Sequence, residues 1–180
     1  MSRKGDWAQI YSGKKFWPLD PKSEEVDIND IAHSLALQCR FNGHSIFFYS
    51  IAQHSVLVSK IVSSEQALAA LFHDASESYT GDIVSPLKKF LPPEFKEIEK
   101  GIEKVIFEHF KIKNVDYCEI KKADKIALFT ERRDLMKKPH SKWDDEGLFK
   151  PHPDKIIPLN PEKAEYEFLE RYRELMERQK

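Results

Sequence analysis

The chain has 180 residues, enough for one domain with a full hydrophobic core. Hydrophobic residues make up 41% and charged residues 33%, a globular balance that excludes a disordered or fibrous chain. The formal net charge of -1 gives no support for DNA or a membrane surface as a partner, and no apolar run approaches the ~18 residues of a membrane span. The two cysteines are isolated and the first residues lack the apolar stretch of a signal peptide, so we expect a cytoplasmic protein with reduced thiols.

The first part of the chain predicts an arm followed by a helix. Between residues 7 and 19, aromatic and polar residues alternate around Ser12-Gly13, which is typical of a short β-hairpin or an extended arm within residues 1–28. Asn29 or Asp30 can then cap a helix. We expect it to end at Asn42-Gly43, because this pair accepts the backbone angles of a helix exit.

Two helices with different signals are expected next. Apolar residues at helical spacing predict the first over residues 48–62. Ser63 followed three residues later by Gln66 matches a capping box. It predicts a second helix over the alanine- and leucine-rich residues 65–79, which Gly81 closes.

Prolines divide the second half of the chain. Pro86 can start a short helical turn, Pro92-Pro93 separates this turn from the next helix, and Asn160-Pro161 caps the last one. The proline-rich residues 138–159 predict a loop. The helices expected in this half cover residues 85–91, 94–110, 117–137 and 160–180. The predicted fold class is therefore all-α. We expect a single domain over residues 1–180, built as a bundle of about six helices.

The segment from residue 71 to residue 90 holds residues that can carry chemistry. His73 and Asp74 are adjacent and Glu77 follows, so on a continuous helix the three side chains would share one sector. An imidazole and a carboxylate suit a divalent cation such as Mn, Fe, Co, Ni or Zn. The second carboxylate could take a proton from a water molecule that this cation activates.

Two further candidate ligands lie on other predicted helices. His54 is on the preceding helix and can face His73 if the two helices run antiparallel. Asp124 lies midway along a later helix, directly after Ala123, whose small side chain lets neighbouring backbones approach. Each has an ordinary alternative, since a single helical His is more often a hydrogen-bonded core or surface residue and a helical Asp is more often solvated or salt-bridged.

The order His, His-Asp, Asp within an all-α pattern resembles the HD-domain phosphohydrolase superfamily. Residues 73–90, HDASESYTGDIVSPLKKF, are similar to the corresponding stretch of bacterial 5′-deoxynucleotidases. The chain also resembles prophage- and phage-encoded HD hydrolases in the patterns SGKxF, DIAHSL, CRFNGH, FYSxAQHS and ERRDLM. The resemblance runs from about Ser12 to Met136 and implies an HD-type helical fold.

The resemblance also implies a role for each matching residue. Four residues match the ligands of one divalent transition metal (Co, Mn, Zn, Ni or Fe): His54, His73, Asp74 and Asp124. Glu77 would activate or orient the attacking water, with Asp74 as the second residue of the catalytic centre. Three residues match the substrate contacts, one to the deoxyribose hydroxyl and two to phosphate oxygens: Asp82, Arg40 and Lys88. A guanidinium fork and an ammonium charge suit phosphate.

Two of these proposed substrate contacts, Arg40 and Lys88, each have an alternative interpretation. In the family pattern the Arg is followed by Trp and its spacing to the first metal His differs by one residue, whereas here Phe41 follows Arg40. Arg40 is thus either a phosphate ligand or part of a structural ion pair. Lys88, beside Lys89, is either a phosphate ligand or a solvated lysine. We expect His33, in an apolar helix, to be a hydrogen-bonded core residue.

Together these features predict a phosphohydrolase that removes phosphate from (2′-deoxy)nucleoside 5′-monophosphates by attack of a metal-bound water. One alternative keeps the site but releases tripolyphosphate from deoxynucleoside triphosphates. Another is a catalytically inert HD-fold protein with a nucleotide-binding or regulatory role. The expected partner is a small nucleotide, with no nucleic acid and no membrane, and the resemblance implies a homodimer or a higher homo-oligomer.

Overall fold

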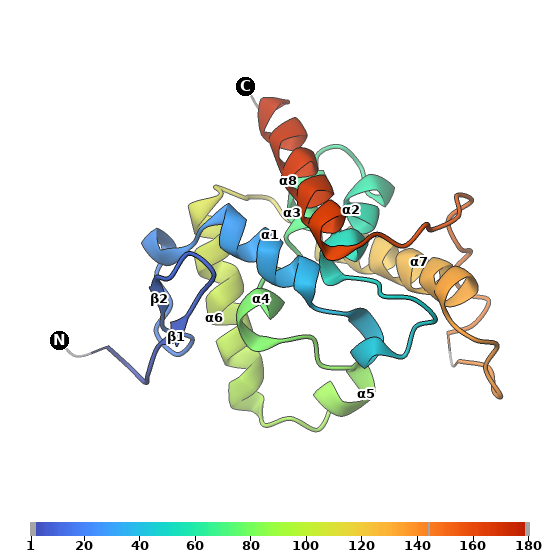
Figure 1. The fold of residues 1–180 in the computed structure, drawn as a ribbon, viewed down its shortest axis with the longest axis horizontal. Coiled ribbons are helices and arrows are strands. Elements are labelled where there is room, and N and C mark those ends of the chain that lie inside the picture. The colour runs from blue at the N-terminus through green and yellow to red at the C-terminus, as the bar shows by residue number, and fades with distance from the viewer. Residues whose placement is uncertain (1–2, 144, 179–180) are drawn as a thin grey trace.

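The computed structural model describes residues 3–143 and 145–178, and this part of the chain is mostly helical (Figure 1). It contains eight α-helices, and five of them have ten residues or more. The longer helices are α1 (Ile28–Leu37), α2 (Ile51–Ile61), α6 (Pro93–His109), α7 (Tyr117–Leu135) and α8 (Pro161–Glu177). The shorter helices are α3 (Ala67–Leu71), α4 (Glu77–Thr80) and α5 (Ser85–Lys88). The predicted all-α class is confirmed.

The N-terminal arm is a small hairpin that is anchored on the helices. Strands β1 (Ala8–Gln9) and β2 (Lys15–Phe16) pair antiparallel, with Ala8 opposite Phe16. The turn between them contains Gly13, whose φ of +80° lies in the region that favours glycine. Phe16 is fully buried and stacks on Tyr79 at the end of α4, with ring centroids 3.8 Å apart. Of the two predicted forms of the arm, the hairpin is the one present.

The main hydrophobic core lies beneath α8. This helix packs across α1, α2 and α3, and it is drawn in red over the blue and green helices in Figure 1. Asn160 caps its first turn by accepting from the backbone N–H of Lys163, as the sequence predicted. Four helices and the turn after α3 contribute large aromatic and aliphatic side chains to this core, among them Leu35, Ile51, Phe72, Ile102, Ile106 and Phe168.

A second, smaller core joins α7 to α2 and α3. Its members are mainly small side chains, and α2 packs closely on both α3 and α7: Val58, Ala69, Ala70, Ile120, Ala123 and Ala127. Ala123 is only 2% exposed. This burial agrees with the prediction that its small side chain admits a neighbouring backbone, and the packing of α7 on α2 brings the next residue, Asp124, to His54.

The first helix differs from its prediction at both ends. Its N-cap is Asp27, whose carboxylate accepts from the backbone N–H of Asn29, so the cap lies before the predicted Asn29 or Asp30. The helix ends at Leu37 because Gln38 is extended, with φ -88° and ψ 126°. Residues 40–43 form a separate 3₁₀ turn. The predicted continuation to Asn42-Gly43 is therefore wrong.

The predicted capping box and the single helix over residues 65–79 are also wrong. Ser63 bonds to Glu119 of α7 instead of capping, and Gln66 starts α3 without a side-chain cap. The helix stops after Leu71 and resumes at Glu77. Between them the backbone makes tighter turns, with the N–H of each of residues 75 and 77 bonded to the carbonyl three residues earlier.

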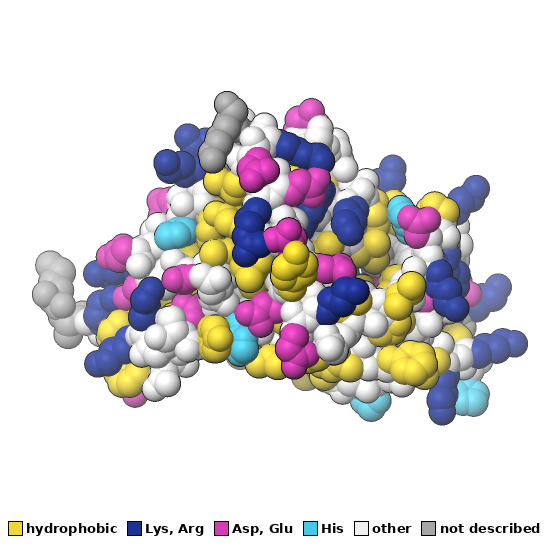
Figure 2. Space-filling model, turned by 45° about the horizontal axis from the view of Figure 1, so that its top comes forward, with side chains coloured by type: hydrophobic (Ala, Val, Ile, Leu, Met, Phe, Trp, Pro, Cys, Tyr) yellow, Lys and Arg dark blue, Asp and Glu magenta, His cyan; other side chains and the backbone are white. Residues whose placement is uncertain are grey.

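Figure 2 shows both acidic and basic side chains on the face of the molecule that it draws. The formal net charge of the chain is -1. Within the described residues, no helix combines the length and the apolar character that crossing a bilayer requires.

Candidate metal centre

Three potential metal ligands from three parts of the chain converge at one point. His54 comes from α2, His73 from the turn after α3 and Asp124 from α7, and one ligand atom of each lies within 4.8 Å of the others. His54 Nε2 is 3.3 Å from His73 Nε2 and 3.2 Å from Asp124 Oδ1. The ordinary readings of His54 and Asp124, as an isolated core histidine and a solvated acid, do not describe this arrangement.

The break after α3 gives His73 its orientation. Its ring Nδ1 lies 2.7 Å from the carbonyl oxygen of Ala70, so the ring donates its N–H there and keeps Nε2 free. When the ring is neutral, its Nε2 carries the lone pair that a metal ion needs. The interrupted helix therefore contributes to the chemistry by turning one imidazole toward His54 and Asp124.

Asp74 adds a second carboxylate to the cluster. Its Oδ2 lies 3.2 Å from His73 Nε2 and 3.6 Å from His54 Nε2. Burial opposes ionisation of Asp74, but His73, His54 and Arg40 hold the pKa of this carboxyl well below its usual range. Burial likewise opposes a charged His73, yet Asp74 raises the pKa of this imidazole to about 9. The two imidazoles and two carboxylates strongly attract positive charge. Such a donor set fits a divalent transition metal.

Glu77 is the first residue of α4, and its side chain is only 8% exposed. Burial, followed by the negative charges of Asp74 and Asp82, raises the pKa of Glu77 to about 9. The predicted single helical sector for His73, Asp74 and Glu77 is wrong, because tight turns rather than a continuous helix connect them. The negative charge of Asp74 nevertheless acts on the carboxyl group of Glu77.

Arg40 combines the two readings that the sequence left open. Its Nη1 is 3.5 Å from Asp74 Oδ2, next to the candidate ligands, and its Nε is 3.3 Å from Glu131 Oε2. Its side chain is 11% exposed. Phe41 and Asn42, which follow it, have φ angles of 57° and 50°, a left-handed backbone that turns the chain sharply here. Arg40 is thus in a buried ion pair and beside the centre at the same time.

Lys88 and Asp82 lie on the segment after α4. Lys88 Nζ is 2.7 Å from Glu99 Oε1 on α6 and 3.7 Å from Glu77 Oε1, and its side chain is 38% exposed, so Lys88 is ion-paired and partly solvated. Asp82 is partly buried, and this burial raises the pKa of its carboxyl. Both side chains therefore border the region of Glu77.

Glu131 is a residue of this region that the sequence reasoning missed. It is 0% exposed on α7, and its Oε1 lies 2.5 Å from His54 Nδ1. A signal for it was present, because Glu131 follows Asp124 by seven residues. Two helical turns place both side chains on the same face of α7.

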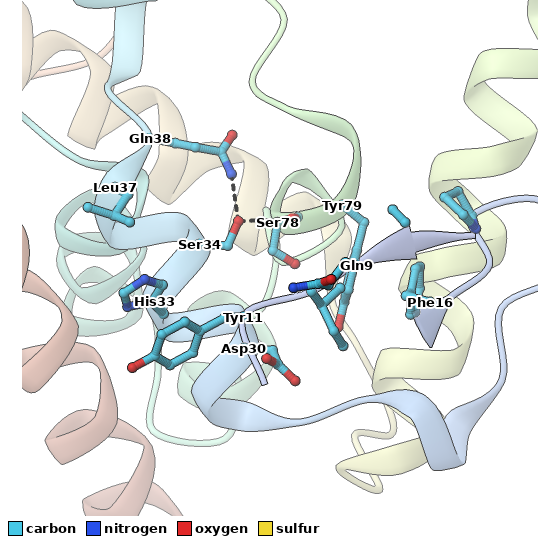
Figure 3. Close-up of a pocket in the computed structure, with 13 residues that line it drawn as sticks. Gln9, Tyr11, Phe16, Asp30, His33, Ser34, Leu37, Gln38, Ser78 and Tyr79 are labelled. Atoms are coloured by element: carbon cyan, nitrogen blue, oxygen red, sulfur yellow. Dashed lines mark hydrogen bonds between the residues drawn. The ribbon is translucent and has the colours of Figure 1, made fainter. Parts of the chain in front are cut away.

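His33 differs from its prediction. It is half-buried rather than in the core, and it stacks on Tyr11 with ring centroids 3.6 Å apart. Its Nδ1 lies 2.9 Å from Glu165 Oε2 on α8. His33 and Tyr11 line a pocket of about 480 Å³ between the hairpin, α1 and α4; Figure 3 shows the residues that line it. This pocket contains none of the candidate metal ligands.

Comparisons with known proteins extend over most of the chain. Residues 40–117 match the family described as 5'-deoxynucleotidase YfbR-like. The chain is 44% identical over 173 residues to the uncharacterized protein YfdR of Escherichia coli K12, an alignment that covers 96% of this chain and 97% of that protein. It is 33% identical over 133 residues to an uncharacterized protein of Rhodobacter capsulatus, covering 69% of this chain and 68% of the relative.

A shorter alignment relates the chain to proteins whose names state an enzymatic activity. The chain is 33% identical over 95 residues to the 5'-deoxynucleotidase of Photorhabdus temperata, which covers 51% of this chain and 45% of that protein. The family match at residues 40–117 includes His54, His73 and Asp74, whereas Asp124 and Glu131 lie beyond it and are brought to the centre by the fold. The chain belongs to the YfbR-like 5'-deoxynucleotidase family of the HD superfamily.

Proposed function

We propose that this protein is a divalent-metal-dependent phosphohydrolase that releases inorganic phosphate from (2′-deoxy)nucleoside 5′-monophosphates. The observation that carries this proposal is the convergence of His54, His73 and Asp124, whose ligand atoms lie within 4.8 Å of one another. Membership of the YfbR-like family supports the choice of a phosphate ester as substrate. The similarity to proteins named 5'-deoxynucleotidase supports the nucleoside monophosphate.

The proposed metal ligands are His54, His73, Asp74 and Asp124. When bound by them, a divalent cation would lower the pKa of the attacking water molecule and would offset negative charge on the phosphate. Nitrogen and oxygen donors in this ratio suit Mn, Fe, Co, Ni and Zn, so the donor set alone does not choose among these metals.

The chain's own residues would manage the proton and the substrate. Glu77 takes a proton from the attacking water and returns it to the O5′ atom of the leaving nucleoside. A new bond forms between the water oxygen and phosphorus while the bond from phosphorus to O5′ breaks. Arg40 and Lys88 hold the phosphate oxygens, and Asp82 hydrogen-bonds the sugar hydroxyl. Because phosphoryl transfer depends chiefly on positioning and charge neutralisation, these contacts supply most of the required chemistry.

Product analysis tests the proposal directly. Metal-free protein is loaded with Mn²⁺ or Co²⁺ and incubated with deoxynucleoside mono- and triphosphates, and phosphate, tripolyphosphate and nucleoside are measured. We expect phosphate and nucleoside from the monophosphates, and loss of both products in a His73→Ala variant. Tripolyphosphate as the main product would instead favour the triphosphohydrolase alternative. A metal-loaded protein that hydrolyses neither substrate would favour the inert, nucleotide-binding alternative.

A further inference from the structure

Glu131 is a fully buried carboxylate with a different neighbour at each oxygen. Its Oε1 lies 2.5 Å from His54 Nδ1, and its Oε2 lies 3.3 Å from Arg40 Nε. Neither Glu131 nor His54 has any exposed side-chain surface. An ionised group without access to water is costly unless it is paired, so these contacts are needed to keep Glu131 in the interior.

The first contact determines which nitrogen of His54 faces the candidate metal centre. When a neutral His54 donates its Nδ1–H to Glu131, the lone pair remains on Nε2. This Nε2 is the atom that lies 3.3 Å from His73 Nε2 and 3.2 Å from Asp124 Oδ1. A carboxylate behind a metal-ligating imidazole also increases the basicity of the ligand and fixes the plane of the ring.

The second contact restrains Arg40. The guanidinium group lies between Glu131 and Asp74, with Nη1 3.5 Å from Asp74 Oδ2. The contact from Nε to Glu131 Oε2 is an ion pair without the alignment of a hydrogen bond. Arg40 therefore keeps donors that are not committed to Glu131, while the charge of Glu131 holds the group in the interior.

We propose that Glu131 is a positioning residue that links the metal ligand His54 to the phosphate-binding Arg40 through its two carboxylate oxygens. This inference rests on the proposed function, because it assigns metal and phosphate to these two side chains. Its consequence is that one substitution at Glu131 weakens the binding of both the metal and the phosphate, although Glu131 contacts neither.

The test uses Glu131→Gln with Co²⁺ and inorganic phosphate as probes. The amide can still accept the N–H of His54, but its NH₂ group then faces Arg40, a donor opposite a donor. Calorimetric titration of the metal-free protein should show Co²⁺ affinity lowered about 10- to 100-fold. Phosphate affinity of the Co²⁺-saturated protein should fall about tenfold, the loss expected for one charge-assisted contact. The visible absorption bands of bound Co²⁺ should shift, since the imidazole is less well oriented.

Glu119→Gln is the matched control. Glu119 is also on α7 and also bonds through both oxygens, but its partners are the backbone N–H and the hydroxyl of Ser63, away from the centre. This variant should keep the Co²⁺ spectrum and both affinities of the unmodified protein. A double variant, Arg40→Met with Glu131→Gln, removes the buried ion pair as a unit and guards against a single variant that fails to fold. It should bind Co²⁺ as weakly as Glu131→Gln.

The outcomes separate this inference from the proposed function. Unchanged Co²⁺ affinity and spectrum in Glu131→Gln, or in the double variant, would overturn the role of Glu131 toward His54. Weakened Co²⁺ binding with unchanged phosphate binding would overturn the link to Arg40. Both measurements are made without turnover, so a protein that binds both probes as expected but hydrolyses no nucleotide would refute the proposed function and leave the inference standing.

Discussion

Glu77 has a carboxyl group whose surroundings favour the protonated form, whereas its proposed task needs the ionised form. Its raised pKa, about 9, comes first from burial and then from the charges of Asp74 and Asp82. A divalent cation held by His54, His73 and Asp124 would add positive charge nearby, which favours the carboxylate. The same residue is therefore expected to be a protonated, stabilising group without metal and a proton acceptor with metal.

The metal-free state gives a pH-dependent prediction for Glu77. Its folded-state pKa of about 9 lies above the ordinary value of 4.5, so the unfolded chain releases a proton that the folded chain retains. The contribution of Glu77 to stability is fully present below pH 4.5 and is lost as the pH rises to about 9. Urea unfolding of metal-free protein at pH 5 and pH 8 should therefore show that the unmodified protein loses stability relative to Glu77→Gln at the higher pH. An equal difference at both pH values would contradict the raised pKa.

The metal-loaded state gives a second prediction for the same substitution. Glu77→Gln should lower turnover of a deoxynucleoside monophosphate about 10²- to 10⁴-fold, the usual contribution of a positioned general base. Metal content, measured by elemental analysis, should stay at that of the unmodified protein, because Glu77 is not among the proposed ligands. Glu97→Gln is the control, since Glu97 is an exposed acid of α6 that pairs with Lys100. Near-normal turnover in Glu77→Gln would remove this residue from the mechanism.

The position of Asp124 depends on how closely α7 packs on α2 and α3. Ala123 is buried against the small core that joins these helices, so Ala123→Val should push α7 outward and move the neighbouring Asp124. We expect a loss of about 1–3 kcal/mol in the free energy of unfolding, typical of an overpacked core, and weaker Co²⁺ binding. Lys122→Val introduces the same side chain at an exposed position of α7 and should leave Co²⁺ affinity unchanged. Equal Co²⁺ affinities for the two variants would show that this packing does not position Asp124.

The helices that the sequence predicted well begin at residues that are typical of helix starts. The α6 and α8 helices start at proline and lie within about one turn of the predicted residues, and Asp116 caps α7 by accepting from two backbone N–H groups. The break between α3 and α4 had no proline or glycine to mark it, and the lower helix propensity of His73, Asp74 and Ser76 is too weak a signal to end a helix alone. The bond from the His73 ring to the carbonyl of Ala70, which marks this break, is visible only in the structure.

The candidate site was predictable where its residues match the metal ligands of a known family, and unpredictable where the role of a residue depends on its contact partners. The order of His54, His73-Asp74 and Asp124 was enough to expect one centre, which the three-residue cluster supports. Glu131 was missed although it lies seven residues after Asp124 and within the ERRDLM pattern, because a single helical glutamate gives no sign of burial. Its contacts join α7 to His54 of α2 and to Arg40 in the turn after α1, and this pairing is visible only in the structure.

At the scale of the whole molecule, the proposed metal centre would act as a cross-link. Its ligands come from α2, the turn after α3 and the middle of α7, segments that are separated by up to 70 residues in the sequence. The unfolded chain cannot hold these side chains together, so a cation that needs all of them binds the folded state alone. Stability and metal affinity are then linked, whatever the substrate.

This linkage gives a prediction that does not depend on catalysis. At a free Mn²⁺ concentration about 100 times its dissociation constant, the free energy of unfolding should rise by about 2.7 kcal/mol relative to protein in EDTA. Asp124→Asn removes the charge of the ligand that α7 supplies, so the variant should gain much less from the same Mn²⁺ concentration. Urea unfolding of both proteins, with Mn²⁺ and with EDTA, measures the two gains. If Mn²⁺ stabilises Asp124→Asn as much as the unmodified protein, the cation binds somewhere else, and α7 has no part in holding it.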